Sequence, residues 1–409
     1  MNWYRNILVV ASVAIFYTSV PNYVHSTYGI VAPLHWVIGF GILSLPLLIK
    51  QIMARSDLLK SPVVVWCFGY AWLTITWFVV SSPQSDWSWQ EVRWRALAII
   101  DIVMFLILFA NPQTNKVVRQ ALVVGVLVGV AFSIYELFVP RSFSNVVGRS
   151  AGLYGNPNAA GEALVLGMIL SVTVLPSKFR APFLLITGVG VFLTLSRGAI
   201  LVWLIAFAGL MLIGKVRVKE LLLTVSVSLL LVVAILLPRW DQFITTLERD
   251  GILNKNVMER IAWLSDPSGV SDDSGWEREY VAKQAWEKVA ERPFLGSGTG
   301  SSHIAYIPSH NQYLSFMQDH GLIGVAILPL LIVAVTWRAH GESKRIAMIF
   351  GFTVLLEGLF SHRVLNEEYM LLLFGVMAAM TLISRESPAR GMHALTPAEI
   401  GVPRAAVGR

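Results

Sequence analysis

The residues best suited to chemistry lie in His310-Asn311-Gln312-Tyr313, where the chain enters an apolar run. The reference pKa of an imidazole is about 6.5, so a histidine can take or release a proton near neutral pH. Asn311 could hydrogen-bond a sugar hydroxyl or orient the imidazole ring. Gly321 and Gly324 follow at a spacing that could let a neighbouring helix approach closely. An interfacial histidine with packing glycines is the alternative, and the residue types leave both interpretations open.

Two arginines are candidates for binding an anion. Arg197 lies between two apolar runs, and Arg278 lies in a charged segment between Glu277 and Glu279. A guanidinium beside a membrane is costly unless it is paired or used, and its planar fork matches phosphate oxygens. The alternatives are a snorkelling side chain for Arg197 and a solvated helix ion pair for Arg278.

A third candidate is the turn Gly155-Asn156-Pro157-Asn158, which leads into an apolar run. Asn156 or Asn158 can cap a helix there, and Pro157 suits its first turn. The free N–H groups of a helix N-terminus could also bind an anion. Capping alone would explain these residue types, so the role of the turn stays open.

Motifs of metal and nucleotide chemistry are missing from the sequence. It has no Walker loop, no nucleophile elbow, no His-Glu-x-x-His pair and no zinc spacing of cysteine and histidine. Asp266, Asp272 and Asp273 lack the ligand spacing of a calcium loop. We therefore expect neither a metal site nor a cofactor.

These candidates belong to a chain of membrane composition. Of its 409 residues, 55% are hydrophobic and 14% are charged, and the mean hydropathy is +0.64. Soluble domains carry roughly 25% charged residues. The net charge of +7 comes from short basic clusters between apolar runs, which predicts membrane topology rather than nucleic-acid binding. The sequence thus predicts an all-α polytopic protein surrounded by membrane lipids.

The apolar runs predict about twelve transmembrane helices, because a crossing needs about 20 residues. The runs fall at 6–24, 28–49, 62–81, 95–110, 119–139, 158–175, 181–196, 198–214, 220–237, 312–337, 346–361 and 366–384. Asp101 and Glu357 lie inside such runs, where ionisable residues are functional or paired. We expect both to be paired inside the bundle.

Basic residues set the expected orientation. They gather in the connections at 50–60, 116–119, 178–180, 215–219 and 338–345, and are sparser in the alternate connections. This bias places both ends of the chain in the cytoplasm. The expected organisation is membrane helices one to nine (1–237), a large periplasmic loop (238–311), membrane helices ten to twelve (312–384) and a disordered cytoplasmic tail (385–409).

The large loop has a pattern of its own. Apolar residues recur among charges at helical spacing, which predicts an amphipathic helix over the membrane face: Trp276, Tyr280, Ala285 and Val289. The helix should end before Pro293, and Gly296, Gly298 and Gly300 should form a flexible turn after it.

Taken together, these motifs resemble the O-antigen ligase superfamily of bacterial membrane glycosyltransferases. The family signature of His-Asn, nine residues and Gly-x-x-Gly is complete at His310, Asn311, Gly321 and Gly324. Further similar segments follow in the family's order over about 150–330: Gly155 to Asn158, Ser196-Arg197-Gly198, and Ser274, Arg278, Pro293, Gly296 and Gly298. Ala282 departs from the pattern, since the family often has Trp four residues after the loop arginine.

The resemblance implies a GT-C-like enzyme of the bacterial inner membrane with its active site facing the periplasm. Its reaction would be an inverting, metal-independent transfer of a glycan from undecaprenyl diphosphate to lipid A–core. The resemblance implies catalytic roles for His310 and Arg278. It implies substrate-binding roles for Arg197, Asn311, Asn158, Tyr313 and Gly298. A lipid diphosphate is already a good leaving group, so such an enzyme mainly needs a base near the acceptor hydroxyl and cations for the developing charge.

Two rival functions remain. An O-antigen polymerase would use the same donor but a second carrier-linked chain as acceptor. A transporter of lipid-linked sugars is a member of another class, and about twelve spans are common there. Transporters often show two similar halves, which this sequence lacks, and a large structured outer loop suits an enzyme better.

Overall fold

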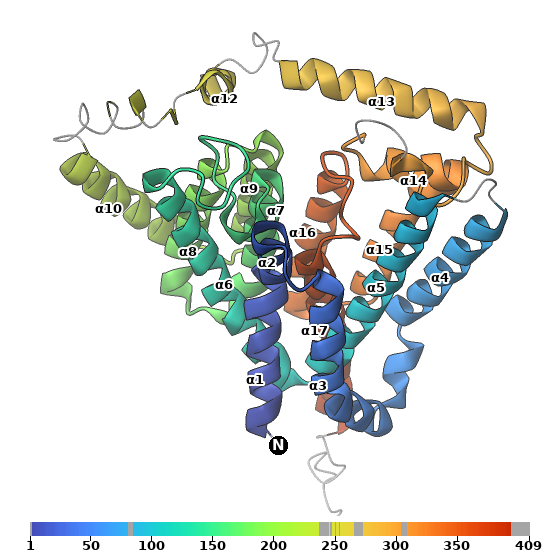
Figure 1. The fold of residues 1–409 in the computed structure, drawn as a ribbon. Coiled ribbons are helices and arrows are strands. Elements are labelled where there is room, and N and C mark those ends of the chain that lie inside the picture. The colour runs from blue at the N-terminus through green and yellow to red at the C-terminus, as the bar shows by residue number, and fades with distance from the viewer. Residues whose placement is uncertain are drawn as a thin grey trace, which may run out of the picture.

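The computed structural model describes residues 2–80, 85–236, 245, 248–249, 251–252, 254–265, 273–303 and 309–393. Every regular element in these residues is a helix (Figure 1). The N-terminal helices are α1 (Asn2–Ser12), η1 (Val13–Tyr17), α2 (Val20–Tyr28), α3 (Pro33–Ala54), η2 (Ser56–Lys60), α4 (Pro62–Val80), α5 (Asp86–Phe109) and α6 (Pro112–Phe138). The central helices are η3 (Gly152–Tyr154), α7 (Pro157–Ser171), η4 (Val172–Val174), α8 (Ser177–Leu193), α9 (Arg197–Leu212) and α10 (Val218–Leu236). The later helices are α12 (Lys255–Ser265), α13 (Asp273–Glu291), η6 (Ser301–His303), α14 (Gln312–His320), η7 (Gly321–Ala326), α15 (Ile327–Thr336), α16 (Gly341–Glu357) and α17 (Glu368–His393).

Each of the predicted apolar runs coincides with at least one helix. Among the described residues, six helices are long and apolar enough to cross a membrane, or seven if the bent pair Trp3–Tyr17 and Val20–Tyr28 is one span. The other runs form helices that are shorter, more charged or only partly described, such as the apolar helix Arg197–Leu212. The fold is therefore that of a polytopic membrane protein, and the number of twelve crossings stays a prediction.

The outer faces of the bundle are apolar, as a bilayer requires. Large side chains point away from the protein on α3 and α4, where Ile42 is 66% exposed, Phe68 73% and Trp72 75%. An apolar surface of this kind would drive aggregation in water, since soluble monomers rarely expose large contiguous apolar patches.

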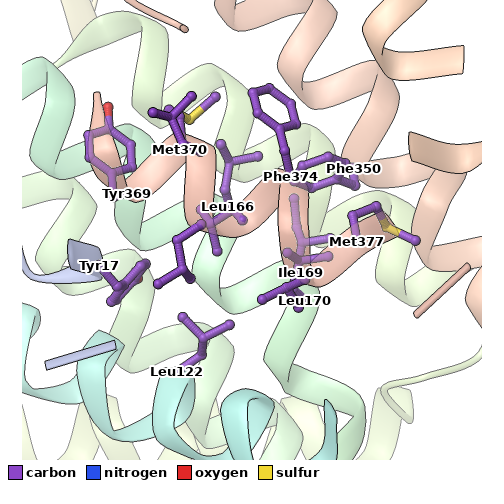
Figure 2. Close-up of a cluster of buried hydrophobic side chains, with 14 of the residues drawn as sticks. Tyr17, Leu122, Leu166, Ile169, Leu170, Phe350, Tyr369, Met370, Phe374 and Met377 are labelled. Atoms are coloured by element: carbon purple, nitrogen blue, oxygen red, sulfur yellow. The ribbon is translucent and has the colours of Figure 1, made fainter. Parts of the chain in front are cut away.

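The centre of the bundle is made by α7 and α17. Every residue from Ala159 to Val172 is buried, and so is every residue from Glu368 to Leu382. Figure 2 shows part of this core, in which side chains of both helices lie against Tyr17, Leu122 and Phe350. Burial on every side means that other helices surround these two, so they form the centre of the bundle.

Small residues allow this close packing. The hydroxyl of Tyr17 donates to the carbonyl oxygen of Ala163 at 2.8 Å. It fits beside Gly167, where a Cβ would lie 2.1 Å from the hydroxyl oxygen. Substituting a larger residue at Gly167 would therefore displace Tyr17 from the core.

The predicted basic connections lie at one end of the bundle, called here the basic end. Side chains tie these connections together: Arg5 to Gln113, Arg55 to Ala110 and to Glu386, Arg180 to Lys215, and Lys215 to Glu342. The opposite end, called here the loop end, is crossed by α13 (Figure 1). The connections thus alternate between two ends, as the charge bias predicts.

The tail boundary differs from the prediction. Helix α17 continues to His393, beyond the expected end of the last span at 384, while residues 394–409 lie outside the described residues. The predicted loop from 238 to 311 is described only in part, and its helices α12 and α13 are the parts that can be compared with the sequence.

A topology experiment tests the orientation. A reporter fused after Lys255 is expected to be periplasmic and one fused after Arg385 cytoplasmic, because the basic connections stay inside. Paired alkaline phosphatase and fluorescent protein fusions measure this. Both fusions on one side of the membrane would contradict the orientation.

Candidate active site

Four arginines gather at the loop end: Arg149, Arg197, Arg260 and Arg278. Arg149 is buried and donates through Nε to the carbonyl oxygen of Thr194 at 2.9 Å. Burial lowers the pKa of the Arg149 guanidinium to about 9, and the other three cations act in the same direction. A concentration of positive potential in a partly buried region suits a multiply charged anion such as a diphosphate.

The loop that carries Arg149 is fixed by one carboxylate. Glu136, near the end of α6, is buried and accepts hydrogen bonds from the backbone N–H groups of Phe143, Ser144, Ala151 and Gly152. These donors lie on both sides of Arg149 along the chain. Charge-assisted hydrogen bonds to a buried carboxylate are among the stronger ones, so the loop has one preferred position.

Two helices begin beside the arginines. Asn156 caps α7 with its side-chain oxygen at 2.8 Å from a backbone nitrogen, and Ser196 caps α9, whose first residue is Arg197. A Cβ on Gly161 would lie 2.4 Å from the Cβ of Ala199, so the first turns of α7 and α9 pack at close range. The N-terminus of each helix adds partial positive charge to the region.

Asn158 joins the arginine cluster. Its Oδ1 accepts a hydrogen bond from Arg149 at 3.0 Å, and the carbonyl oxygen of Leu195 accepts one from Arg260 at 3.1 Å. Three residues predicted from the sequence, Asn158, Arg197 and Arg278, are thus brought into one region. Arg149 and Arg260 complete it.

His310 lies against a second histidine, His362. Their rings meet edge to face with centroids 5.1 Å apart. His310 has a φ of 48°, a left-handed conformation that residues with a side chain seldom adopt and that is often found at functional sites. Burial lowers the pKa of His362 to about 3, and Arg363 and His310 act in the same direction. His362 is therefore neutral at physiological pH.

The segment 358–362, which follows α16, links the histidines to the helix that begins with Arg197. A Cβ on Gly198 would lie 3.4 Å from the ring of Phe360, which is close to His362 in the chain. The N–H group of Gln312 donates to the carbonyl oxygen of Gly358 at 2.8 Å. The same short segment therefore contacts the first turn of α9 and the first turn of α14. The candidate base and the candidate anion-binding residues share one region.

A buried charge network shares a small cavity with His362. Arg95 pairs with Glu91 at 2.8 Å and with Asp319, and all three side chains are buried. Nε2 of His303 lies 3.0 Å from the second oxygen of Glu91, and this hydrogen bond raises the pKa of His303. A small polar cavity of about 10 Å³ is lined by members of this network and by His362.

A comparison with known families finds a match to part of the chain. A family model described as O-antigen ligase matches residues 182–329. This segment is therefore similar to the O-antigen ligase superfamily. It includes Arg197, Arg278 and His310, whereas Arg149 and Asn158 precede it. The match to residues 182–329 supports the resemblance inferred from the sequence motifs. Among curated protein sequences, none matches the chain.

Within this segment, several predicted site residues have structural partners. Asn311 caps α14 by accepting a hydrogen bond from Leu314 N–H at 3.1 Å, and the hydroxyl of Tyr313 donates to the carbonyl oxygen of Leu355 at 2.7 Å. The N–H group of Gly298 donates to the backbone of Asp319 at 3.1 Å. These contacts position the residues, and their roles in substrate binding stay predictions.

The signature glycines act differently from the sequence-based expectation. Gly321 has a φ of 71°, and a Cβ there would lie 2.6 Å from the backbone of Phe294. A Cβ on Gly324 would lie 2.1 Å from the carbonyl oxygen of Phe316. Neither glycine serves the approach of a neighbouring membrane helix, which corrects the prediction. Gly321 lets the turn after α13 pack onto α14, and Gly324 lets η7 fold back on α14.

The loop helix is confirmed, and its buried stripe agrees with the prediction in part. Helix α13 ends at Glu291, before Pro293, as predicted. Among the residues of α13 whose burial is described, the predicted Ala285 and Val289 are buried together with Val281, while Tyr280 is 49% exposed. The side chain of Trp276 lies outside the described residues. The buried stripe therefore follows a spacing of four residues from Val281. The glycine turn that follows has positive φ at Gly296, Gly298 and Gly300, as a turn requires.

The two ionisable residues of the apolar runs lie near other carboxyl groups. Glu357 shares a hydrogen bond with Glu162, which also accepts one from the hydroxyl of Tyr369 at 3.0 Å. Asp101 interacts electrostatically with Glu368. The pairing expected from the sequence is therefore found for Glu357, whose partner is another carboxyl group, whereas no hydrogen bond joins Asp101 and Glu368 in the described part of the chain.

Sequence reasoning missed part of the site. Arg149 lies in one of the connections with few basic residues, and His362 lies in a short connection; neither belongs to a motif that the sequence offers. Glu91 and Arg95 are four residues apart on one helix, and Asp319 lies inside an apolar run. The rule that ionisable residues in apolar runs are paired or functional would have found Asp319, but its partner on α5 is distant in sequence.

Among the described residues, no group of three or more potential ligands could hold a metal ion.

The buried network predicts a large effect on stability. Arg95→Met is expected to lower the free energy of unfolding by about 3–5 kcal/mol, because Glu91 and Asp319 would lose their buried cation. Thermal unfolding in detergent measures this. The control is Arg217→Met, whose side chain is 77% exposed and which should unfold like the unmodified protein. Equal melting temperatures for the two variants would contradict the role of Arg95.

Proposed function

We propose that this protein is a membrane glycosyltransferase that ligates undecaprenyl-diphosphate-linked O-antigen to lipid A–core. The observation that carries the proposal is that the segment 358–362 contacts both His310 and the first turn of α9, where the arginine cluster lies. The family match at residues 182–329 includes His310, Arg197, Arg260 and Arg278. The active site would face the periplasm of a bacterial inner membrane. The polyprenyl tail of the donor would lie between the membrane helices.

In the proposed reaction His310 takes the proton from an acceptor hydroxyl, and the oxygen attacks the anomeric carbon of the donor sugar. The bond between that carbon and the diphosphate breaks, and the configuration at the carbon inverts. Arg149, Arg197 and Arg278 stabilise the negative charge that develops on the diphosphate. The proton ends on His310, and the neutral ring of His362 beside it adds no repulsive charge. The mechanism needs no metal, because the guanidinium groups supply the positive charge.

The second candidate function is O-antigen polymerisation, since the family match fits both activities. The complete His-Asn and Gly-x-x-Gly signature favours the ligase. A strain from which the gene is deleted separates the two. Loss of all capped lipopolysaccharide with carrier-linked polymer retained supports the ligase, and a cap of a single repeat supports the polymerase.

Reconstitution tests the activity directly. Purified protein in vesicles, with carrier-linked glycan and lipid A–core, is expected to form a covalent glycan–lipid A–core product. Carrier-linked glycan as the only substrate is the control for polymerisation. Intact protein that moves the donor across the bilayer without forming any covalent product would support the rival transporter function and reject the proposal.

A further inference from the structure

A cavity of about 760 Å³ lies among α2, α3, α5 and α17 at the loop end. Its volume is within the range of small-molecule sites, which is about 300–1,000 Å³. The cavity is separate from the arginine cluster, which is built by α7, α8, α9 and the loop segments before and after them. None of the residues predicted from the sequence to bind substrate lines it.

Two buried carboxyl groups line this cavity. Asp101 is 1% exposed and Glu368 is 6% exposed. Oδ1 of Asp101 and Oε2 of Glu368 have no hydrogen-bond partner among the described residues. A buried polar group without a partner costs free energy, so these oxygens are suited to accept hydrogen bonds from a bound molecule.

Aromatic and cationic side chains line the part of the cavity nearer the start of α5. Trp89 is 50% exposed, and Trp94 lies there with Arg93. Indole rings offer flat apolar faces, and the guanidinium of Arg93 offers several hydrogen-bond donors. Flat rings combined with carboxyl acceptors and a guanidinium donor match a polyhydroxylated ring.

The cavity adjoins the candidate active site. Asn366 lines it and also lines the small polar cavity that His362 shares with Glu91 and His303. His362 in turn contacts His310. The histidines therefore lie between the arginine cluster and the cavity.

A lipid tail is a poorer occupant than a sugar. Hydrocarbon would leave the oxygens of Asp101 and Glu368 without partners in an apolar environment, which is costly. Sugar hydroxyls would satisfy both carboxyl groups.

We propose that this cavity binds a saccharide unit of the acceptor and directs its hydroxyl toward His310. The inference rests on the proposed function, because only a transferase has an acceptor. The acceptor is assigned here, rather than the donor, because the donor's diphosphate belongs with the arginines on the other side of the histidines. Asp101, Glu368 and Trp89 are the residues that recognise the saccharide unit of the acceptor.

The test uses substitutions that the fold should tolerate. Asp101→Leu replaces a buried group that has an unpartnered oxygen by an apolar one, so the protein should be at least as stable as the unmodified one. The Michaelis constant for lipid A–core should rise about tenfold in Asp101→Leu and in Trp89→Ala, as expected for a lost binding contact. The turnover number and the Michaelis constant for the carrier-linked donor should change little.

Matched controls lie outside the cavity. Thr353→Val also removes a buried unpartnered hydroxyl, on α16, and Trp72→Ala removes a tryptophan that is 75% exposed on α4. The two control variants should have the same Michaelis constants as the unmodified protein, for lipid A–core and for the carrier-linked donor. An unchanged acceptor constant in both cavity variants overturns the proposal, and a rise in the donor constant alone assigns the cavity to the donor and overturns it too.

A binding measurement separates this inference from the proposed function. Calorimetry with delipidated core oligosaccharide and the full-length His310→Ala protein needs no turnover. Binding that is lost on adding Asp101→Leu supports the saccharide site even if no transfer is found. Binding that persists unchanged in that double variant overturns the site even if the protein is a ligase.

Discussion

His310→Ala is expected to lower the rate of glycan transfer by about two to four orders of magnitude, the usual contribution of a positioned general base. Donor binding should persist, because the diphosphate would be held by the arginine cluster rather than by the imidazole. Transfer by purified protein in vesicles measures the rate, and retention of labelled donor measures binding. His340→Ala, a substitution at the basic end of the bundle, is the control and should keep full activity.

The pH dependence of the rate identifies the base. The rate should fall as the pH drops through the pKa of His310, because the protonated imidazole cannot take a proton. His362 cannot cause this acid limb, since its pKa is lowered to about 3. His303 has a raised pKa, so its pair with Glu91 is stable at low pH and weakens only as the pH rises through that pKa. An acid limb that survives unchanged in His310→Ala would place the base elsewhere.

Arg278→Ala and Arg197→Ala are each expected to abolish transfer or reduce it severely, because the diphosphate would lose a charge-assisted, bidentate partner. Arg149→Ala should have the same effect, since Arg149 shares their region and holds Asn158. Lysine should restore activity only partly at each position, because an ammonium group lacks the planar fork.

The controls for the arginines separate function from folding. Each variant should reach the membrane at the normal level, as measured by fractionation and by elution in detergent. Arg217→Ala removes an exposed arginine at the basic end and should leave transfer unchanged. Near-normal activity in Arg278→Ala and Arg197→Ala would remove these residues from the site.

Local patterns predicted the helices of this protein well. The apolar runs around Leu122, Leu166 and Phe374 each form a helix, because chain length and hydropathy decide where a membrane helix can lie. Helix α13 and its end before Pro293 also followed from periodicity and from the effect of proline. The face that α13 buries followed only in part, since Ala285 and Val289 are buried but Tyr280 is exposed, because the buried face depends on what packs against the helix.

The candidate site was predicted in its residue types but not in its arrangement. The motifs named His310, Arg197 and Arg278 as candidates, since residue types that could accept a proton or bind phosphate are recognisable one at a time. The contacts of Arg149 with Asn158 and of His310 with His362 join segments that no periodicity relates.

The sequence by itself determined that the chain is a helical membrane protein with a candidate base and several candidate anion-binding cations near one end of its helices. Hydropathy and charge bias act locally, so they can be recognised without a fold. Only the tertiary structure decided which of these groups meet, because contacts such as Arg95 with Asp319 and His303 with Glu91 join residues far apart in the chain. It also decided that Asp101 and Glu368 line one cavity, since burial without a partner is a property of packing rather than of residue type.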